Sequence, residues 1–136
     1  MDAFLNYIVQ DIDIEEDSNF KKYNIGHTKE RYKKMQNFSE GFILIFIPSR
    51  GKYAYMDSRS YVIIPKQYAE YGFFREGRAK VKDYNGKWGY INPKMEEVIA
   101  TKYDEIGFFK DGLAKVKNYG RSQTIDKNGT CIFDCY

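Results

Sequence analysis

The side chains that most often carry catalysis or bind metal are scarce in this chain. His27 is the only imidazole, and Cys131 and Cys135 are the only thiols. A histidine base needs a nucleophile or an orienting acid beside it, and no motif supplies either group to His27. A hydrolase built around His27 is therefore a distant alternative to a protein with no catalytic residues.

The two cysteines are four residues apart near the C-terminus. If that stretch is an extended strand, they share a face at a separation of about 13 Å, which is too far for a disulfide. A zinc site would need further ligands, and the chain has no second cysteine pair. We therefore predict free structural thiols, no metal and no cofactor. Free thiols are typical of a reducing, cytoplasmic compartment.

Carboxylate pairs and nucleotide-binding motifs give no stronger candidate for catalysis. Asp104-Glu105 and Glu96-Glu97 are adjacent pairs, and neighbours on a strand point to opposite faces. The sequence contains no phosphate-binding loop, no glycine-rich dinucleotide motif and no Gly-x-Ser-x-Gly elbow. We predict that the protein is not an enzyme.

Aromatic side chains are the best candidates for binding. The chain has 13 Tyr, 10 Phe and one Trp, and such rings can stack on sugars, peptides or bases. We take Tyr53, Tyr55, Tyr84 and the cationic Lys87 as possible ligand-facing residues. Alternation along a strand also allows half of the rings, with Trp88 among them, to be core residues. Both interpretations remain open.

These residues belong to an internal repeat, which must position them. The pattern Phe-x-acid-Gly occurs at residues 38–41, 74–77 and 109–112, at spacings of 36 and 35 residues. A period of this length is typical of stacked supersecondary units. We predict three repeats, at residues 38–73, 74–108 and 109–136.

Each repeat is expected to form an antiparallel β-meander. In the middle copy, residues 78–82 alternate small or apolar side chains with charges, which is the period of a half-buried strand. Asn85-Gly86 then favours a hairpin turn, and residues 87–91 and 97–99 follow as two more strands. The glycine after each acidic residue is expected to have a positive φ. Gly89, inside a strand, predicts a bulge or the close approach of another backbone.

The middle copy resembles the WG repeat, also called the KWG repeat, of bacterial proteins. The resemblance covers residues 38–136, and only the middle copy has the Trp-Gly pair. It implies tandem β-rich units that act as binding or scaffolding modules, and it supplies no catalytic residues. Its signature corresponds here to Gly41, Gly77, Gly86, Lys87, Trp88, Gly89, Tyr90 and Gly112.

Residues 1–37 do not match the repeat. Apolar residues from Phe4 to Ile12 follow the spacing of an amphipathic helix, and residues 29–36 could form a second helix capped by Thr28. We predict a small helical cap over the end of the array. A brief strand around Ile14 is an alternative, as is a helix that binds a partner or a membrane surface.

Charge and hydropathy indicate neither a nucleic-acid-binding protein nor a membrane-spanning one. The main functional prediction is therefore a non-catalytic interaction module. The formal net charge of +3 is too small to indicate nucleic-acid binding without a clustered basic face. The longest apolar run, residues 42–47, is far below the ~20 residues of a membrane-spanning helix, and the first residues do not resemble a signal peptide. We therefore expect a cytoplasmic protein that binds or scaffolds other proteins. The alternative is binding of carbohydrate or cell envelope through surface aromatics.

Overall fold

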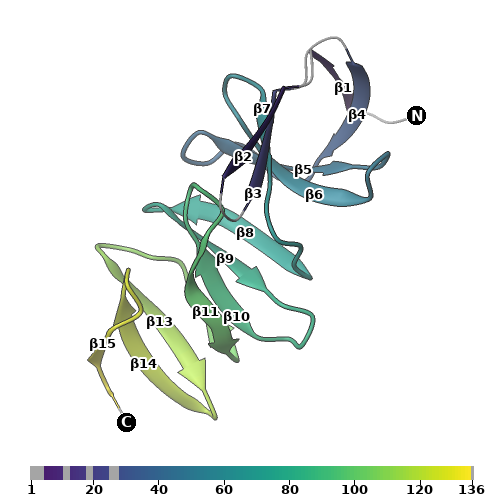
Figure 1. Cartoon of the computed structure of the whole chain (residues 1–136). Coiled ribbons are helices and arrows are strands. Elements are labelled where there is room, and N and C mark those ends of the chain that lie inside the picture. The colour runs from purple at the N-terminus through teal and green to yellow at the C-terminus, as the bar shows by residue number, and fades with distance from the viewer. Residues whose placement is uncertain (1–4, 11–12, 18–19, 25–27, 136) are drawn as a thin grey trace. The chain divides into compact units, whose positions relative to one another are not determined.

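The computed structural model shows an all-β chain (Figure 1). It describes the backbone of residues 5–10, 13–17, 20–24 and 28–135, and the side chains from residue 32 onward. The chain forms two compact units, residues 1–67 and 68–136. The prediction of a mainly β fold built from tandem antiparallel repeats is confirmed.

The first unit contains one seven-stranded antiparallel sheet. The first repeat contributes a central meander, and the preceding strands pair with both of its edges, in the order β1-β4-β5-β6-β7-β3-β2. The strands are β1 (Leu5–Gln10), β2 (Asp13–Asp17), β3 (Phe20–Asn24), β4 (Thr28–Lys34), β5 (Phe42–Ile47), β6 (Lys52–Asp57) and β7 (Tyr61–Ile64).

The helical cap predicted for residues 1–37 is wrong for the backbone that the structure describes there. Both stretches expected to be helical contain strands instead, because β1 pairs with β4 along its whole length and β4 continues the sheet to β5. The pattern that favoured a helix spans only nine residues, and pairing with a distant segment outweighs so short a pattern. The strand that the sequence allowed around Ile14 is present as β2.

The first repeat carries a continuous apolar core. Its six core side chains are at most 6% exposed, and Tyr32 and Ile64 pack against them. Leu44, on the opposite face of β5, is also buried, so the apolar run at residues 42–47 has buried side chains on both of its faces. The core residues are Ile43, Ile45, Ile47, Ala54, Met56 and Val62.

The second unit contains two four-stranded antiparallel sheets, one for each remaining repeat. The second sheet has the order β11-β10-β9-β8, and the third has the order β12-β13-β14-β15. The second sheet consists of β8 (Glu70–Arg75), β9 (Arg78–Lys82), β10 (Trp88–Ile91) and β11 (Glu97–Tyr103). The third consists of β12 (Glu105–Ile106), β13 (Leu113–Asn118), β14 (Arg121–Asp126) and β15 (Cys131–Phe133).

The acidic-glycine pairs form the turns that start each repeat. Glu76 and Gly77 have φ of 52° and 75°, and the pairs at residues 40–41 and 111–112 are alike. Two successive positive φ angles define a type I′ hairpin turn, whose twist matches that of the flanking strands. The positive φ expected at Gly41, Gly77 and Gly112 is confirmed, and the acidic residue before each glycine has a positive φ as well.

The turn after the second strand is also repeated. Asp57, Asn92 and Asp126 occupy equivalent positions at or just beyond the end of that strand, and one side-chain oxygen of each accepts the backbone N–H groups two and four residues later. Such bonds satisfy the donors of a tight loop. Asp83 does the same in the turn of Gly86, whose φ is 84°.

Gly89 allows a bulge in the second sheet. Trp88 pairs with Tyr103 whereas Tyr90 pairs with Ile99, so β11 has extra residues opposite Gly89. A Cβ atom at position 89 would lie 2.3 Å from the backbone oxygen of Ile99 and 2.8 Å from two further backbone atoms. The glycine of the Trp-Gly pair is therefore required by the close approach of β11, as the sequence predicted.

Candidate functional site

Two of the predicted ligand-facing tyrosines belong to the first unit. Tyr55 is fully buried, opposite Leu44 on β5 and Ile63 on β7. The prediction that it faces a ligand is therefore wrong, because the apolar neighbours on both sides make this face of β6 part of the interior. Tyr53 is half-buried, and its ring lies 4.8 Å from that of Phe46.

Tyr84 and Lys87 lie on the hairpin between β9 and β10. The Tyr84 side chain is 76% exposed, which is compatible with contact to a ligand. Lys87 is instead ion-paired with Asp104, whose second oxygen accepts the Tyr119 N–H at 3.0 Å. The hydrogen bond from Lys87, followed by that from Tyr119, lowers the pKa of Asp104, and the same bond to Asp104 raises the pKa of Lys87.

Trp88 and Tyr90 have different surroundings although they share a face of β10. Trp88 is half-buried, and the ammonium groups of Lys80 and Lys82 lie 5.2 and 5.6 Å from its ring centre, a cation–π arrangement. Tyr90 is 1% exposed, and burial raises the pKa of its hydroxyl. Trp88 is therefore shielded by lysines and Tyr90 is a core residue.

Tyr90 lies where the second and third sheets pack together. Its ring is 4.8 Å from that of Phe109, and its hydroxyl donates to the Gly107 carbonyl at 2.6 Å. Ile99 belongs to the same cluster. The third sheet contributes the side chains of Phe109, Ala114, Val116 and Ile125 to this interface.

A carboxylate fastens the turns of the two repeats to each other. The side-chain oxygens of Glu76 accept the backbone N–H groups of Asp111 and Gly112 at 2.7 and 2.8 Å. Nearby, Arg78 Nε donates to the Lys127 carbonyl at 3.1 Å. The acidic residue of one I′ turn thus binds the equivalent turn of the next repeat.

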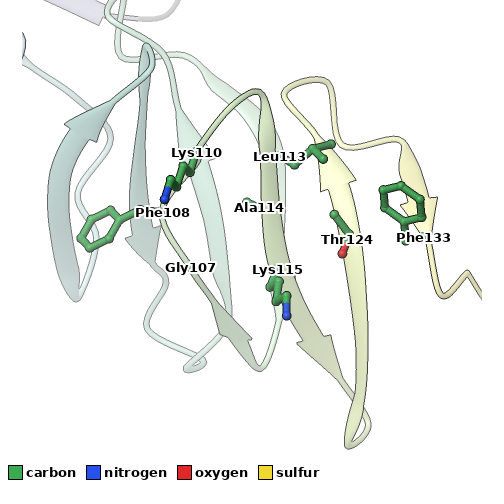
Figure 2. Close-up of a pocket in the computed structure, with 8 residues that line it drawn as sticks. All are labelled: Gly107, Phe108, Lys110, Leu113, Ala114, Lys115, Thr124 and Phe133. Atoms are coloured by element: carbon green, nitrogen blue, oxygen red, sulfur yellow. The ribbon is translucent and has the colours of Figure 1, made fainter.

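The opposite side of the third sheet carries a cavity. It has a volume of about 530 Å³ and is lined by residues from the segment before β13 and from three strands (Figure 2). Phe133 and Phe108 are 57% and 45% exposed. The lining residues are Gly107, Phe108, Lys110, Leu113, Ala114, Lys115, Thr124 and Phe133.

The strand register shows which face of the repeat bears this cavity. Thr124 pairs with Lys115 in the third sheet as Tyr90 pairs with Lys80 in the second. Tyr90 faces the next repeat, so Thr124 lies on the equivalent face of the third sheet. We call this the open face, and it comprises Gly107, Lys110, Leu113, Lys115, Thr124 and Phe133.

The open face differs from its equivalent in the second sheet in side-chain type at three positions, and conservatively at a fourth, where Lys110 replaces Arg75. Thr124 stands where the second repeat has Tyr90, Leu113 where it has Arg78, and Phe133 where it has Ile99. Thr124 is smaller than the tyrosine at the equivalent position and Gly107 has no side chain, so neither residue fills the cavity that both line. The face is apolar in its middle, with Lys110 and Lys115 supplying positive charge.

The prediction of free thiols is wrong. Cys131 and Cys135 form a disulfide, with their Cα atoms 5.8 Å apart. An extended strand would have kept the two thiols apart, but β15 ends at Phe133 and Asp134 has a φ of 57°, which turns the chain back. The disulfide closes a short ring that contains Phe133, so it constrains one residue of the open face.

The other candidate groups do not form a site in the part of the chain that the structure describes. His27 lies outside the described residues. Across the described ranges, no three His, Cys, Asp or Glu side chains gather in a way that could hold a metal ion. None of the described residues lies in a helix able to span a membrane.

The open face was not predicted from the sequence, although the repeat contained a signal for it. The alignment places Thr124 and Phe133 at the positions of Tyr90 and Ile99, and both of those residues are buried against side chains of the third sheet. Locating the cavity also required the pairing register of β13 and β14, because this register shows which side chains share a face of the third sheet.

Comparison with known proteins is consistent with the repeat architecture. A family model described as WG containing repeat matches residues 53–88 and 88–121, which together make up about half of the chain. Neither the curated proteins nor the solved structures gave a match.

Proposed function

The chain belongs to the WG containing repeat family, and from this premise we propose that it is a non-catalytic module that binds a partner protein through the open face. The observation that carries this proposal is the cavity of about 530 Å³ on the third sheet, with the exposed Phe108 and Phe133 at its sides. Exposed apolar hollows of this kind are typical of interaction sites.

The chemistry of the lining favours binding over catalysis. Its polar side chains are those of Lys110, Lys115 and Thr124, which provide no carboxylate or imidazole for acid–base work. Two lysines beside an apolar floor suit a protein surface that combines apolar and acidic side chains, because charge complementarity guides such encounters.

Site-specific photo-crosslinking tests the proposal. Phe133 is replaced by the photo-reactive benzoylphenylalanine in the source cells, and crosslinked products are identified by mass spectrometry. Ile132 provides the matched control, because it is 44% exposed on the same strand and points to the opposite side. We expect a protein adduct at position 133 and none at 132. Equal labelling at both positions, or no adduct at 133, would contradict the proposal.

Carbohydrate binding is a second candidate, supported by a different surface. Tyr84 and Tyr119 are 76% and 87% exposed, and they lie on equivalent hairpins of successive repeats, which Asp104 connects through Lys87 and the Tyr119 N–H. Exposed tyrosines repeated in this way could stack on sugar rings. A glycan array probed with the protein and with the Tyr84→Ala/Tyr119→Ala variant tests this idea. Sugar binding that survives both substitutions, or none at all, would count against it.

A cytoplasmic location is also a proposal. A reducing cytoplasm would keep Cys131 and Cys135 as thiols, so their redox state in intact cells is the test. Rapid alkylation before lysis should label both cysteines in the cytoplasm. Protection of both from alkylation, reversed by a reductant, would contradict this location.

A further inference from the structure

We infer that a row of alternating cations and aromatic rings in the second unit is a binding surface for an extended acidic segment of a partner protein. The row shares no residue with the open face, so a partner could occupy it whether or not the open face binds a protein. We call this row the cation–aromatic ladder. Its members, in order, are Lys82, Trp88, Lys80, Phe108, Arg75 and Phe73.

Each cation of the ladder lies close to the ring or rings beside it. The ammonium groups of Lys82 and Lys80 are 5.6 and 5.2 Å from the centre of the Trp88 ring. Lys80 is also 4.9 Å from the Phe108 ring centre, and the Arg75 guanidinium carbon is 5.2 Å from the same centre. Distances below about 6 Å are typical of cation–π attraction, so the rings hold the positive groups in a row.

Strand register gives part of the ladder the spacing of an extended chain. Lys80 and Lys82 occupy alternate positions of β9, on the face opposite its two fully buried side chains. Trp88 is opposite Lys82 on β10, and the Phe108 ring extends toward the second sheet from the segment before β13 (Figure 2). Alternate residues of a strand are about 6.6 Å apart, so the two lysines match the spacing of alternate side chains in an extended peptide.

Gly72 on β8 fixes the path of the Lys80 side chain. A Cβ atom at position 72 would lie 2.6 Å from Cγ of Lys80 and 3.4 Å from its Cε. The aliphatic stem of the lysine therefore lies directly on the glycine backbone. A cation that is held in place before binding loses less conformational entropy when an anion arrives.

Two of the three cations have no acidic partner among the described side chains. Lys82 Nζ is 3.1 Å from a carboxylate oxygen of Glu70, its cross-strand neighbour on β8. Lys80 and Arg75 form no ion pair with any residue whose side chain the structure describes. The carboxylate of Glu76, which follows Arg75 in the sequence, binds the turn of the third repeat. Lys80 and Arg75 are therefore available to carboxylates of another molecule.

The chemistry of the ladder favours a polypeptide over a nucleic acid. Glu70 shows that a carboxylate on a neighbouring strand reaches a cation of the ladder, and a partner segment could present carboxylates to Lys80 and Arg75 in the same way. A guanidinium over a ring keeps N–H groups at its edge, and their geometry matches a carboxylate. The bases of a nucleic acid would need uncovered rings for stacking, whereas cations lie over the rings of Trp88 and Phe108.

Titration with acidic peptides tests the inference. The probe is a fluorescein-labelled peptide in which Glu alternates with Thr. The control peptide has the same composition in alternating Glu-Glu and Thr-Thr pairs, so that no two carboxylates are two residues apart. We expect saturable binding of the first peptide and binding of the second that is weaker by about tenfold. Trp88 is the only tryptophan, so the unlabelled first peptide should also change the tryptophan emission.

A pair of double variants shows whether the ladder is the site. Arg75→Gln/Lys80→Gln should weaken binding of the alternating peptide about tenfold or more, because two charge-assisted contacts are lost. Lys94→Gln/Lys102→Gln is the matched control, because both lysines are exposed and Lys102 lies over the Tyr103 ring, outside the ladder. It removes the same charge and should change binding by less than about twofold. Circular dichroism reports whether each variant is folded.

Each remaining outcome overturns the inference. If the folded original chain binds neither peptide, the ladder contributes only to packing of the second and third sheets. Equal binding of the two peptides, or equal weakening by the two double variants, would show attraction by overall charge; the peptide comparison decides if the Arg75→Gln/Lys80→Gln variant does not fold. Tighter binding of an oligothymidylate than of the alternating peptide would indicate a nucleic-acid partner. The crosslink from Phe133 is measured separately, so the proposed function stands or fails independently of these results.

Discussion

Glu76 and Asp111 hold equivalent places in successive repeats, and the carboxylate of the first accepts the backbone N–H of the second at 2.7 Å across 35 positions of the chain. The acidic residue of the turn therefore has two roles. Its backbone forms the turn of its own repeat, and its side chain binds the turn of the next. An acidic residue, rather than the more usual asparagine, precedes glycine in all three turns, and the bonds to the next turn account for this choice at Glu76.

Glu76→Gln should destabilise the second unit. A glutamine offers one acceptor oxygen and an NH₂ group where the carboxylate accepts two N–H groups, so one turn N–H loses its partner. Loss of a charge-assisted hydrogen bond of this kind costs about 1–3 kcal/mol. Urea unfolding measures the change.

Asp111→Asn is the matched control for that measurement. It makes the same change of charge at the equivalent turn position, but the Asp111 side chain is exposed, so its effect on unfolding should be within about 0.5 kcal/mol. Equal destabilisation by both substitutions would show that charge, and not the inter-repeat bond, is responsible.

Gly89→Ala should be the most damaging single-methyl change in the second sheet. The added Cβ would lie 2.3 Å from the Ile99 backbone oxygen, and a backbone cannot rotate away as a side chain does. We expect a loss of about 1–3 kcal/mol, the usual cost of overpacking, with faster amide exchange in β10 and β11.

Gly107→Ala separates this steric effect from the general effect of replacing glycine. The nearest atom to a Cβ there is the Lys115 oxygen at 3.5 Å, and φ is not in the left-handed region. The free energy of unfolding of the Gly107→Ala variant should therefore stay near that of the original chain. If Gly89→Ala were equally mild, the close approach of β11 would not be what requires glycine.

The features predictable from the sequence are those set by local chemistry and repetition. The acidic-glycine pattern predicted the positive φ of Gly77, and an isolated glycine between Trp88 and Tyr90 predicted the close approach of a backbone. Repetition supported these interpretations, because the same residue types recur at equivalent positions.

The features missed depend on contacts that no local pattern contains. The strand β1 is defined by pairing with β4 rather than by its own apolar spacing. The Cys131–Cys135 disulfide depends on one left-handed residue, Asp134, and aspartate alone does not specify that conformation. Burial of Tyr55 depends on both neighbouring strands being apolar on the same face.

Acid should weaken the second unit through Asp104. The hydrogen bond from Lys87 and that from the Tyr119 N–H lower the pKa of Asp104 in the folded state. A carboxyl with a lowered folded pKa stabilises the fold above its unfolded pKa of about 3.9, and that contribution is lost as the pH falls through the folded pKa. Urea midpoints of the original chain and of Asp104→Asn should differ at pH 6, and the difference should shrink as the pH falls below about 4. A difference that is constant between these pH values would contradict the role of Asp104.

Reduction of the Cys131–Cys135 disulfide should release the open face locally without unfolding the third sheet. The bond closes a ring of a few residues, for which the chain-entropy model gives a contribution of only about 2 kcal/mol, while the core residues Ala114, Val116 and Ile125 lie away from it. In the Cys131→Ser/Cys135→Ser variant we expect faster amide exchange at Phe133, unchanged exchange in β13, and a weaker crosslink from position 133. Retention of both the slow exchange and the crosslink would show that pairing of β15 with β14 alone positions Phe133. Loss of protection throughout β13 would instead mean that the disulfide stabilises the whole sheet, because the effect would no longer be confined to the strand that carries the two cysteines.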